Sequence, residues 1–346
     1  MTSTPARWRR VDPGLVSGLA VLAFLFAVSF AWDVQLTTAM VAGPIVASFW
    51  TSPRRTAAVA VAALTLSVTG GFWLDLPFSA GYWFRVGICA ALSGLAVLGA
   101  LTRERRESRL QRMTVIAETA QRAVLRAMPT AIGSVGLAAR YVSASAEALV
   151  GGDLYEVAAT PFGVRVVVGD VRGKGLEAVQ TAAAVLGAFR AAAFTAADIA
   201  DLARTIDETL ARMIGEEEFV TAIVGQFDGE RVTLANCGHH PPLLVVGADV
   251  TTADTGEPTL PLGLGAEPVL TEHPWPVGAR VLFYTDGLVE ARDARGEFFP
   301  LDDYAAELGE GSVEEALDRL VERLLAWGGQ QMADDLALVL AESEPR

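Results

Sequence analysis

Four long apolar stretches fill the first hundred residues of the chain. They cover residues 13–32, 34–50, 56–74 and 82–101, and the first contains LVSGLAVLAFLFAVSFAW without a charge. A helix needs about 20 apolar residues to cross the hydrocarbon core of a bilayer. The pattern therefore predicts an α-helical bundle of four transmembrane helices within residues 1–102. Small residues in the fourth stretch, VGICAALSGLAVLGAL, would allow neighbouring helices to approach closely.

Arginine residues mark alternate loops of this region. They precede the first stretch, separate the second from the third at Arg54 and Arg55, and follow the fourth from Arg103 onward. Loops rich in arginine and lysine face the cytoplasm. The sequence thus predicts a multi-pass protein of the inner (plasma) membrane, embedded in the lipid bilayer, with cytoplasmic N- and C-termini. A cleaved signal peptide would also start with a basic segment, but three further apolar stretches follow and no small-residue cleavage site precedes a soluble domain.

A charged, glycine-free segment joins the two halves over residues 103–129 and ends at Pro129. Two series of apolar residues recur in it every seven positions, Leu110, Ala117 and Val124 in one and Met113, Ala120 and Ala127 in the other. This spacing predicts a helical linker that forms a short parallel coiled coil, and with it a homodimer through residues 103–129. A single amphipathic helix lying on its own domain is the alternative.

Beyond residue 131 the apolar positions fall into short runs such as FGVRVVVGD, RVLFYTDG and DDLALVLA. Their length, β-branched residues and flanking turn residues predict strands. Helical stretches, at residues 175–195 and 197–214, stand together in a block instead of following every strand. A later helix opens with a capping box at Ser312 and Glu315. The arrangement favours an α+β domain with antiparallel sheets over a doubly wound fold.

The two halves of the chain differ in net charge. Eleven basic and five acidic residues lie in residues 1–112, which leaves −20 on the rest of a chain whose formal charge is −14. So acidic a domain is a poor ligand for nucleic acid, since such binding depends on clustered lysine and arginine; we expect no nucleic-acid partner. Two cysteines, Cys89 and Cys237, are too few for a disulfide framework or a cysteine zinc cluster.

The stretch VVVGDVRGKGLEA, residues 166–178, runs from a strand through a glycine turn into a helix. A P-loop would need glycine where Val168 stands and serine or threonine where Gly175 stands. A dinucleotide-binding turn would be matched by its glycines, but the chain continues as a helix where that fold requires a second strand ending in an acid. We therefore interpret Asp170, which closes the strand, as the functional residue.

Other aspartates stand at strand ends as Asp170 does. Asp153 follows two glycines in GGDLYE, Asp286 ends VLFYTDG, and Asp334 opens DDLALVLA. Each alone is ordinary turn chemistry. Together they can converge on one edge of a sheet, where their mutual repulsion would be neutralised by hard divalent cations such as Mg²⁺ or Mn²⁺. A pair of such ions suits hydrolysis of a phosphoester by a metal-activated water, without a serine or cysteine nucleophile.

Six motifs carry a resemblance to a known family: GGDLYEV, GDVRGKGLEA, NCGHHPPLLV, PLGL, LFYTDGLVEARD and DDLALVLA. In order and approximate spacing they resemble the SpoIIE-type branch of the PP2C-like (PPM) metal-dependent serine/threonine protein phosphatases. The resemblance covers residues 131–343 and not the apolar half. It implies an α-β-β-α sandwich, with two antiparallel sheets face to face, helices outside, and two Mn²⁺ or Mg²⁺ ions at one edge.

The resemblance also implies roles for individual residues. It makes Asp153 and Asp170 metal ligands, with Asp170 bridging the two ions and the backbone carbonyl of Val171 as a further ligand. Asp286 and Asp334 would complete the shell of the other ion. These four aspartates would be the catalytic residues, acting through metal-bound water.

Some positions depart from the family pattern or carry a weaker assignment. Asp335 is the neighbouring acid and ranks below Asp334 as a ligand. Val171 and Arg172 stand where eukaryotic relatives have a histidine, so no general acid is assigned. Substrate binding is assigned to three residues, Arg172, Lys174 and His239.

The resemblance implies a membrane-anchored protein phosphatase that hydrolyses phosphoserine or phosphothreonine. Its phosphorylated protein substrate would be an anti-sigma-factor antagonist of the STAS type, in signalling to transcription. A second hypothesis is a catalytically weak membrane receptor or scaffold that binds its partner through a phosphatase-like domain. All four aspartates at the metal positions are present, which argues against the second hypothesis.

Overall fold

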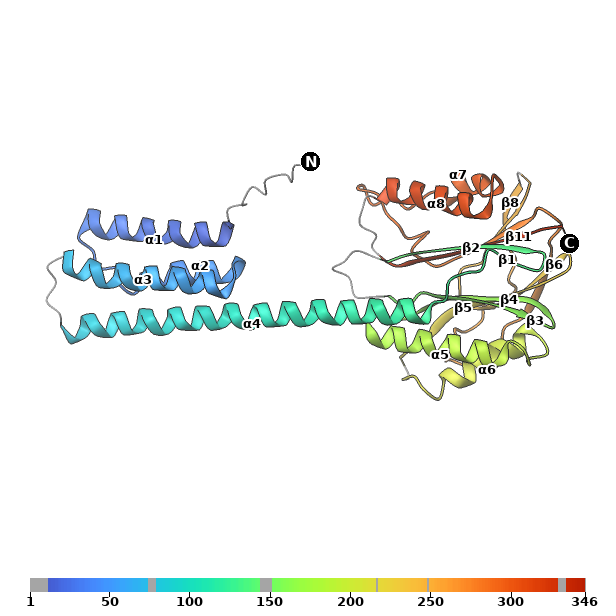
Figure 1. Ribbon diagram of the computed structural model, residues 1–346, viewed down its shortest axis with the longest axis horizontal. Helices are drawn as coiled ribbons and strands as arrows, with labels where there is room; N and C mark the ends of the chain where they lie inside the picture. Colours follow the sequence, from blue (N-terminus) through green and yellow to red (C-terminus); the bar gives the residue numbers. More distant parts are fainter. Residues whose placement is uncertain are drawn as a thin grey trace, which may run out of the picture. The chain divides into compact units, whose positions relative to one another are not determined.

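The computed structural model describes residues 12–73, 79–143, 151–215, 217–247, 249–328 and 334–345. Contacts divide the chain into two compact units, Met1–Arg112 and Met113–Arg346. The described part of the first unit is helical, and the second is built on two β-sheets (Figure 1).

The N-terminal unit consists of α1 (Pro13–Trp32), η1 (Ala39–Val41), α2 (Ala42–Trp50), α3 (Pro53–Trp73) and the first part of α4 (Ala80–Val124). Asp12 caps α1, since its side chain accepts hydrogen bonds from the backbone N–H groups of Gly14 and Leu15. Those groups have no partner inside the helix, so the cap fixes where α1 begins.

Two helices in the described part of the chain are long and apolar enough to cross a membrane, Pro13–Trp32 and Ala80–Leu110. The second predicted span, residues 34–50, is helical only over Ala39–Trp50. Twelve helical residues reach about 18 Å, well short of the ~30 Å hydrocarbon core. The predicted four-span bundle is therefore not confirmed.

Small residues allow helices α1 and α2 of this unit to pack closely. A Cβ atom on Gly18 would lie 2.9 Å from the Cβ of Ala47, and one on Gly43 would lie 2.6 Å from Cγ of Leu22. The small residues of the fourth stretch fall into two groups. Cys89, Ser93 and Ala100 are buried, whereas a Cβ atom would meet nothing within 4 Å at Gly87, Gly94 and Gly99.

The C-terminal unit is a sandwich of two antiparallel sheets with helices on both outer faces (Figure 1). One sheet has the order β1-β2-β11-β10-β7-β8, and the other has the order β3-β4-β5-β6-β9. Helices α5 and α6 cover the second sheet, and α7 and α8 cover the first. These four layers match the α-β-β-α sandwich that the sequence implied.

The strands are β1 (Ala131–Ile132), β2 (Val135–Val142), β3 (Leu154–Thr160), β4 (Gly163–Val171), β5 (Val220–Asp228), β6 (Arg231–Cys237), β7 (Leu243–Val246), β8 (Asp249–Thr252), β9 (Leu270–Pro274), β10 (Arg280–Tyr284) and β11 (Leu336–Ser343). The helices are α5 (Leu176–Ala192), α6 (Ile199–Leu210), α7 (Leu301–Ala305), η2 (Ala306–Gly309) and α8 (Val313–Gly328), with the end of α4. The capping box of α8 forms as expected, with Ser312 and Glu315 each accepting the other's backbone N–H.

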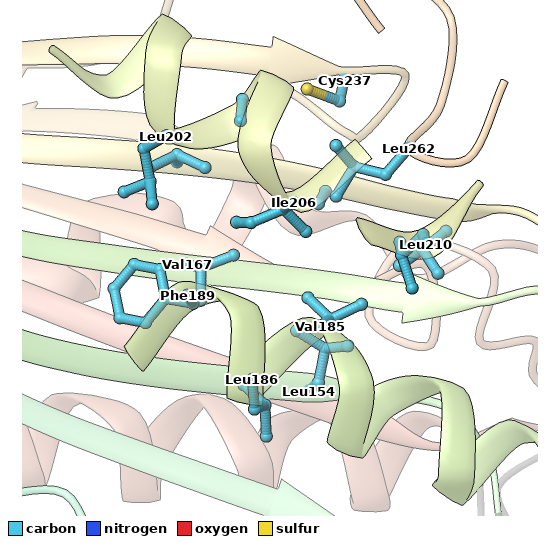
Figure 2. Packing of buried hydrophobic residues seen from close by; sticks show 14 of the residues in the cluster. Leu154, Val167, Val185, Leu186, Phe189, Leu202, Ile206, Leu210, Cys237 and Leu262 are labelled. Carbon is cyan, nitrogen blue, oxygen red and sulfur yellow. The ribbon is translucent and has the colours of Figure 1, made fainter. Parts of the chain in front are cut away.

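Apolar side chains hold the layers together. Val166 and Val168 of β4 point between the sheets and pack with Phe283 of β10, because alternate residues of a strand face the same side. Val167, on the other face, packs under α5 and α6 (Figure 2). Strand β4 is therefore buried on both faces, which explains its run of three valines, residues 166–168.

Helix α4 ends at Val124, five residues before Pro129. Val124 and Leu125 pack against the core beneath α5 and α6, and Arg190 of α5 donates a hydrogen bond to the Val124 carbonyl at 2.9 Å. The prediction of a helix as far as residue 129 is thus wrong at its C-terminal end. The last position of the predicted seam, Ala127, lies outside the helix.

Asp207 of α6 fixes the PLGL loop. Its Oδ1 accepts hydrogen bonds from the backbone N–H groups of Gly263, Gly265 and Ala266, at 2.7, 3.1 and 3.0 Å. We expect Asp207→Ala to lower the free energy of unfolding by about 3 kcal/mol, because it leaves three N–H groups without their acceptor. Urea unfolding measures this. Exposed Glu208→Ala on the same helix is the control and should change stability by less than about 0.5 kcal/mol. Equal effects of the two changes would contradict this role for Asp207.

Candidate metal centre

The strand order brings the four predicted aspartates to one edge of the sandwich. In one sheet, Leu154 at the start of β3 pairs with Gly169 near the end of β4, so Asp153 and Asp170 are neighbours. In the other sheet, Tyr284 at the end of β10 pairs with Leu338 near the start of β11. Each sheet thus contributes two acids, Asp153 and Asp170 from one and Asp286 and Asp334 from the other.

A hydrogen bond between the sheets shows how close the two pairs are. Thr285, next to Asp286, donates its hydroxyl proton to Oδ2 of Asp153 at 2.6 Å. The same Thr285 oxygen accepts the backbone N–H of Ala337 at 2.9 Å. One threonine therefore ties the ends of β10 and β11 to the carboxylate at the start of β3.

The acids repel one another. Burial, followed by the charge of Asp286, raises the pKa of Asp170 to about 7, and Asp334 and Asp335 act in the same direction. Asp153 is 2% exposed, and burial followed by the charge of Asp170 raises its pKa well above the usual value. Burial and the charge of Asp334 also raise the pKa of Asp286. Among the described residues, the carboxylates at this edge outnumber the basic side chains paired with them.

Within the described part of the chain, one salt bridge involves any of these four acids. Lys174 Nζ lies 3.0 Å from Oδ1 of Asp334, and both side chains are about half exposed. Across the same residues, no group of three or more histidine, cysteine, aspartate or glutamate side chains is arranged to hold a metal ion. The donor set nonetheless fits a hard divalent cation, because it consists of carboxylates whose mutual repulsion such an ion would relieve.

Two glycines allow Asp153 to approach the end of β4. A Cβ atom on Gly152 would lie 2.5 Å from the Cβ of Val171, and one on Gly151 would lie 2.4 Å from Oδ2 of Asp335. The Asp335 side chain and the Val171 residue, including its carbonyl oxygen at 2.7 Å from the Gly152 position, therefore occupy the space that a side chain would need. This explains the GG pair before the first acid, which sequence reasoning had read only as a turn.

The neighbouring acids Asp334 and Asp335 have different surroundings. Asp335 is 2% exposed, and its Oδ2 accepts hydrogen bonds from the Tyr141 hydroxyl at 2.6 Å and from the Gly151 N–H at 2.8 Å. The Asp334 side chain is 45% exposed and faces Lys174. Asp335 thus holds strand ends together, which leaves Asp334 as the more available carboxylate.

The end of α4 reaches this edge. Nε2 of Gln121 donates hydrogen bonds to the Gly151 carbonyl at 3.1 Å and to the Tyr141 hydroxyl. Gln121 is 7% exposed, so the contact is buried. Sequence reasoning missed Gln121, Tyr141 and Thr285, because a lone glutamine, tyrosine or threonine carries no pattern that predicts such contacts.

The glycine turn of the sequence lies directly beyond Asp170. Gly173 and Gly175 have φ angles of +113° and +90°, which side-chain-bearing residues rarely adopt, and α5 starts at Leu176. Arg172 Nη1 donates to the Glu217 carbonyl at 2.6 Å, and its guanidinium lies 5.3 Å from the ring centroid of Phe219. The turn therefore presents Arg172 and Lys174 at the rim of the acidic edge.

His239 does not lie where a substrate-binding residue should. It is 7% exposed, with Nδ1 3.1 Å from the Thr221 hydroxyl and Nε2 3.1 Å from the Tyr284 carbonyl. Burial lowers the pKa of its imidazole to about 3. Both ring nitrogens are engaged inside the protein, so this geometry disfavours the predicted contact between His239 and a substrate. The exposed neighbour His240 stacks on the Tyr284 ring, with centroids 6.0 Å apart.

Two facing antiparallel sheets with helices outside and clustered aspartates at one edge define a PP2C-type phosphatase domain. Residues 160–344, just over half of the chain, match the family model described as stage II sporulation protein E (SpoIIE). The chain therefore belongs to the SpoIIE family, and its C-terminal unit is homologous to PP2C serine/threonine phosphatases.

Three solved structures are similar to this chain. The RsbU and RsbW domains of a Mycobacterium tuberculosis protein show 27% identity, a TM-score of 0.51 and coverage of 61% of each chain. The PP2C and partial regulatory domain of Bacillus subtilis SpoIIE shows 17% identity, a TM-score of 0.51 and coverage of 61% of this chain and 64% of that one. The SiaA PP2C domain of Pseudomonas aeruginosa shows 18% identity, a TM-score of 0.57 and coverage of 71% and 99%.

The alignments span less than two thirds of the first two structures, so those proteins contain regions without a counterpart here. The second and third structures support the fold alone, because their identity to this chain is low. The family match starts at residue 160, so Asp153 lies outside it and Asp170, Asp286 and Asp334 lie inside.

Proposed function

We propose that this protein is a membrane-anchored, metal-dependent phosphatase that removes phosphate from phosphoserine or phosphothreonine of a partner protein. One observation carries the proposal. Four strand-end aspartates from distant parts of the sequence meet at one edge, where burial and mutual repulsion raise the pKa values of Asp153, Asp170 and Asp286. Structural ion pairs would lower these pKa values instead.

Asp153, Asp170, Asp286, Asp334 and the Val171 carbonyl would hold two Mn²⁺ or Mg²⁺ ions. Ions of this kind lower the pKa of water and stabilise charge on the phosphate oxygens. The chain's own part is to fix the carboxylates. Thr285 holds Asp153 through its hydroxyl. Main-chain groups and Tyr141 hold the adjacent Asp335.

Arg172 and Lys174 stand at the rim on a turn flanked by glycines, where they can meet the phosphate of an incoming protein. Arginine suits this task because its planar fork binds phosphate in a bidentate way. An anti-sigma-factor antagonist of the STAS type is the proposed substrate, supported by the sequence motifs and by similarity to RsbU domains.

Two apolar helices support membrane attachment, and the arginine pattern of the loops supports a multi-pass arrangement with cytoplasmic termini. On α4, Met113 lies on the predicted seam and is 50% exposed. An exposed apolar residue at a seam position supports a homodimer through this segment. Because Val124 packs on its own domain, the dimer contact would end before it.

The test is phosphate release by the full-length protein in detergent. We expect release from phosphoserine and phosphothreonine peptides with Mn²⁺, a fall to background with excess EDTA, and recovery when Mn²⁺ is restored. A phosphotyrosine peptide is the control and should be a poor substrate. Release that persists with EDTA would exclude the metal-dependent mechanism. Partner binding without any release under these conditions would favour the scaffold hypothesis instead.

A further inference from the structure

The imidazole of His239 has an unusual position: it bridges the two sheets at the acidic edge. Gly238, with φ +70°, leads from β6 into the turn that carries it. Asn236 locks this turn, since its Oδ1 accepts the His239 N–H at 2.8 Å and its Nδ2 donates to the His239 carbonyl at 2.9 Å. With its backbone held on both sides, the His239 ring has a fixed direction.

The two partners of the ring settle its tautomer. The Tyr284 carbonyl can only accept, so Nε2 must carry the proton and donate to it. Because burial lowers the pKa of the imidazole to about 3, the ring is neutral, so Nδ1 is an acceptor and the Thr221 hydroxyl donates to it at 3.1 Å. That hydroxyl has one proton, which favours Nδ1 over the more distant Asp170 carbonyl at 3.4 Å. His239 is therefore a neutral ring whose one N–H and one lone pair are both engaged inside the protein.

The residues on either side of the ring connect it to the acids. Thr221 of β5 pairs directly with Asp170 of β4, in one sheet. Tyr284 is the last residue of β10, two residues before Asp286, in the other sheet. His239 thus spans the gap between the strand that positions Asp170 and the strand that positions Asp286.

We propose that His239 is a positioning residue that sets the separation of Asp170 and Asp286 by cross-linking the two sheets at the acidic edge. This inference rests on the proposed function, since it concerns the geometry of the divalent-metal site. A site that takes ligands from both sheets depends on their spacing, and ions of this kind tolerate little error in ligand distance. Loss of the bridge should therefore weaken metal binding before it affects catalysis at saturating metal.

Calorimetric Mn²⁺ titration of the full-length protein tests the proposal without relying on activity. We expect His239→Leu to raise the Kd for Mn²⁺ about tenfold. Thr221→Val removes only the hydroxyl that donates to Nδ1 of His239 and should raise the Kd by a similar factor. The double variant should bind Mn²⁺ little more weakly than either single variant. His239→Gln should recover part of the affinity, because its amide can still donate to the Tyr284 carbonyl. Phosphate release by His239→Leu should return toward the wild-type rate at saturating Mn²⁺.

His273→Leu is the matched control. His273 lies on β9 of the same sheet as β5, and its Nε2 also bonds a backbone carbonyl, that of Asp254 at 2.8 Å. Unlike Thr221 and Tyr284, this partner is not on a strand that positions one of the acids. Its loss should leave the Mn²⁺ affinity unchanged.

Unchanged Mn²⁺ affinity in His239→Leu, with only a lower melting temperature, would overturn the proposal and leave His239 as a support of the fold. A lower kcat at saturating Mn²⁺ with the loss of one limb of the pH profile would also overturn it, in favour of proton transfer. If the wild type bound no Mn²⁺, the proposed function itself would fail, and this inference with it.

Discussion

Asp170→Asn is expected to lower phosphate release by at least about 10³-fold, because it removes the carboxylate that interacts with the other three predicted ligands, Asp153, Asp286 and Asp334. Stabilisation by a divalent ion contributes several kcal/mol to such a reaction, and 1.4 kcal/mol corresponds to a factor of ten. Asp286→Asn should have a comparable effect from the other sheet. Asp228→Asn is the control, since Asp228 lies exposed at the end of β5 and outside the acidic edge. Activity retained by both site variants would contradict the metal centre.

Although Asp170→Asn should lower activity, it should raise the stability of the metal-free protein. The pKa of Asp170 is raised to about 7 in the folded protein, from 3.8 in the unfolded chain. The metal-free fold therefore prefers the protonated acid, and its stability falls as pH rises from about 4 to about 7. The charges of Asp286, Asp334 and Asp335 strengthen the effect on Asp170, whereas the hydrogen bond with Asp153 opposes it.

Melting temperatures in EDTA measure this second effect. Asp170→Asn should melt higher than the wild type at pH 8, and the difference should shrink at pH 5, where Asp170 is largely protonated. Addition of Mn²⁺ should raise the melting temperature of the wild type, because the ion binds only the folded state. The variant should gain much less. A variant that is less stable than the wild type at pH 8 without metal would show that Asp170 has a stabilising partner.

Gly287→Ala is expected to disrupt the site through its backbone. A Cβ atom there would lie 2.0 Å from the Asp335 carbonyl oxygen, which belongs to the main chain and cannot rotate away. The chain after β10 must then move away from the start of β11, and Asp286 from Asp334. We expect a loss of at least about 2 kcal/mol in the free energy of unfolding and weaker Mn²⁺ binding.

Gly187→Ala provides the contrast. Gly187 is exposed within α5, and a Cβ atom on it would meet nothing within 4 Å. An alanine in the middle of a helix should raise stability by up to about 1 kcal/mol and leave activity unchanged. Urea unfolding and Mn²⁺ titration of both variants separate the two cases. Similar stability of Gly287→Ala and wild type would show that the β10–β11 edge adapts more easily than its packing suggests.

Local patterns were sufficient for the main outline of the C-terminal unit. The apolar run of β4 ends at Asp170 and a glycine turn, and the structure has a strand, a turn with positive φ angles and a helix in the same places. The capping box at Ser312 and Glu315 likewise formed. Such features depend on residues close in the sequence, so that the residue types alone predict them.

The N-terminal half shows where apolar composition was insufficient. Residues 34–50 are apolar enough to suggest a span, yet the α-helix there covers only Ala42–Trp50, after a short 3₁₀ helix. Helix length depends on where the backbone leaves its helical path, and a hydropathy pattern does not report that. The helical linker was predicted to be too long for a similar reason: the Val124 carbonyl accepts a hydrogen bond from Arg190 of α5, 66 residues away, and the sequence pattern does not show this contact.

The sequence by itself determined the class of fold, the family resemblance and the four strand-end aspartates, because alternation, turn chemistry and motif order are all readable along the chain. The tertiary structure alone decided which neighbours those aspartates have. Tyr141 and Asp335 are 194 residues apart, and His239 bonds Thr221 and Tyr284, 18 and 45 positions away. Contacts of this kind arise only when strand register and sheet packing bring distant residues together, so the sequence suggested His239 as a substrate ligand and could not show that its ring contacts both sheets.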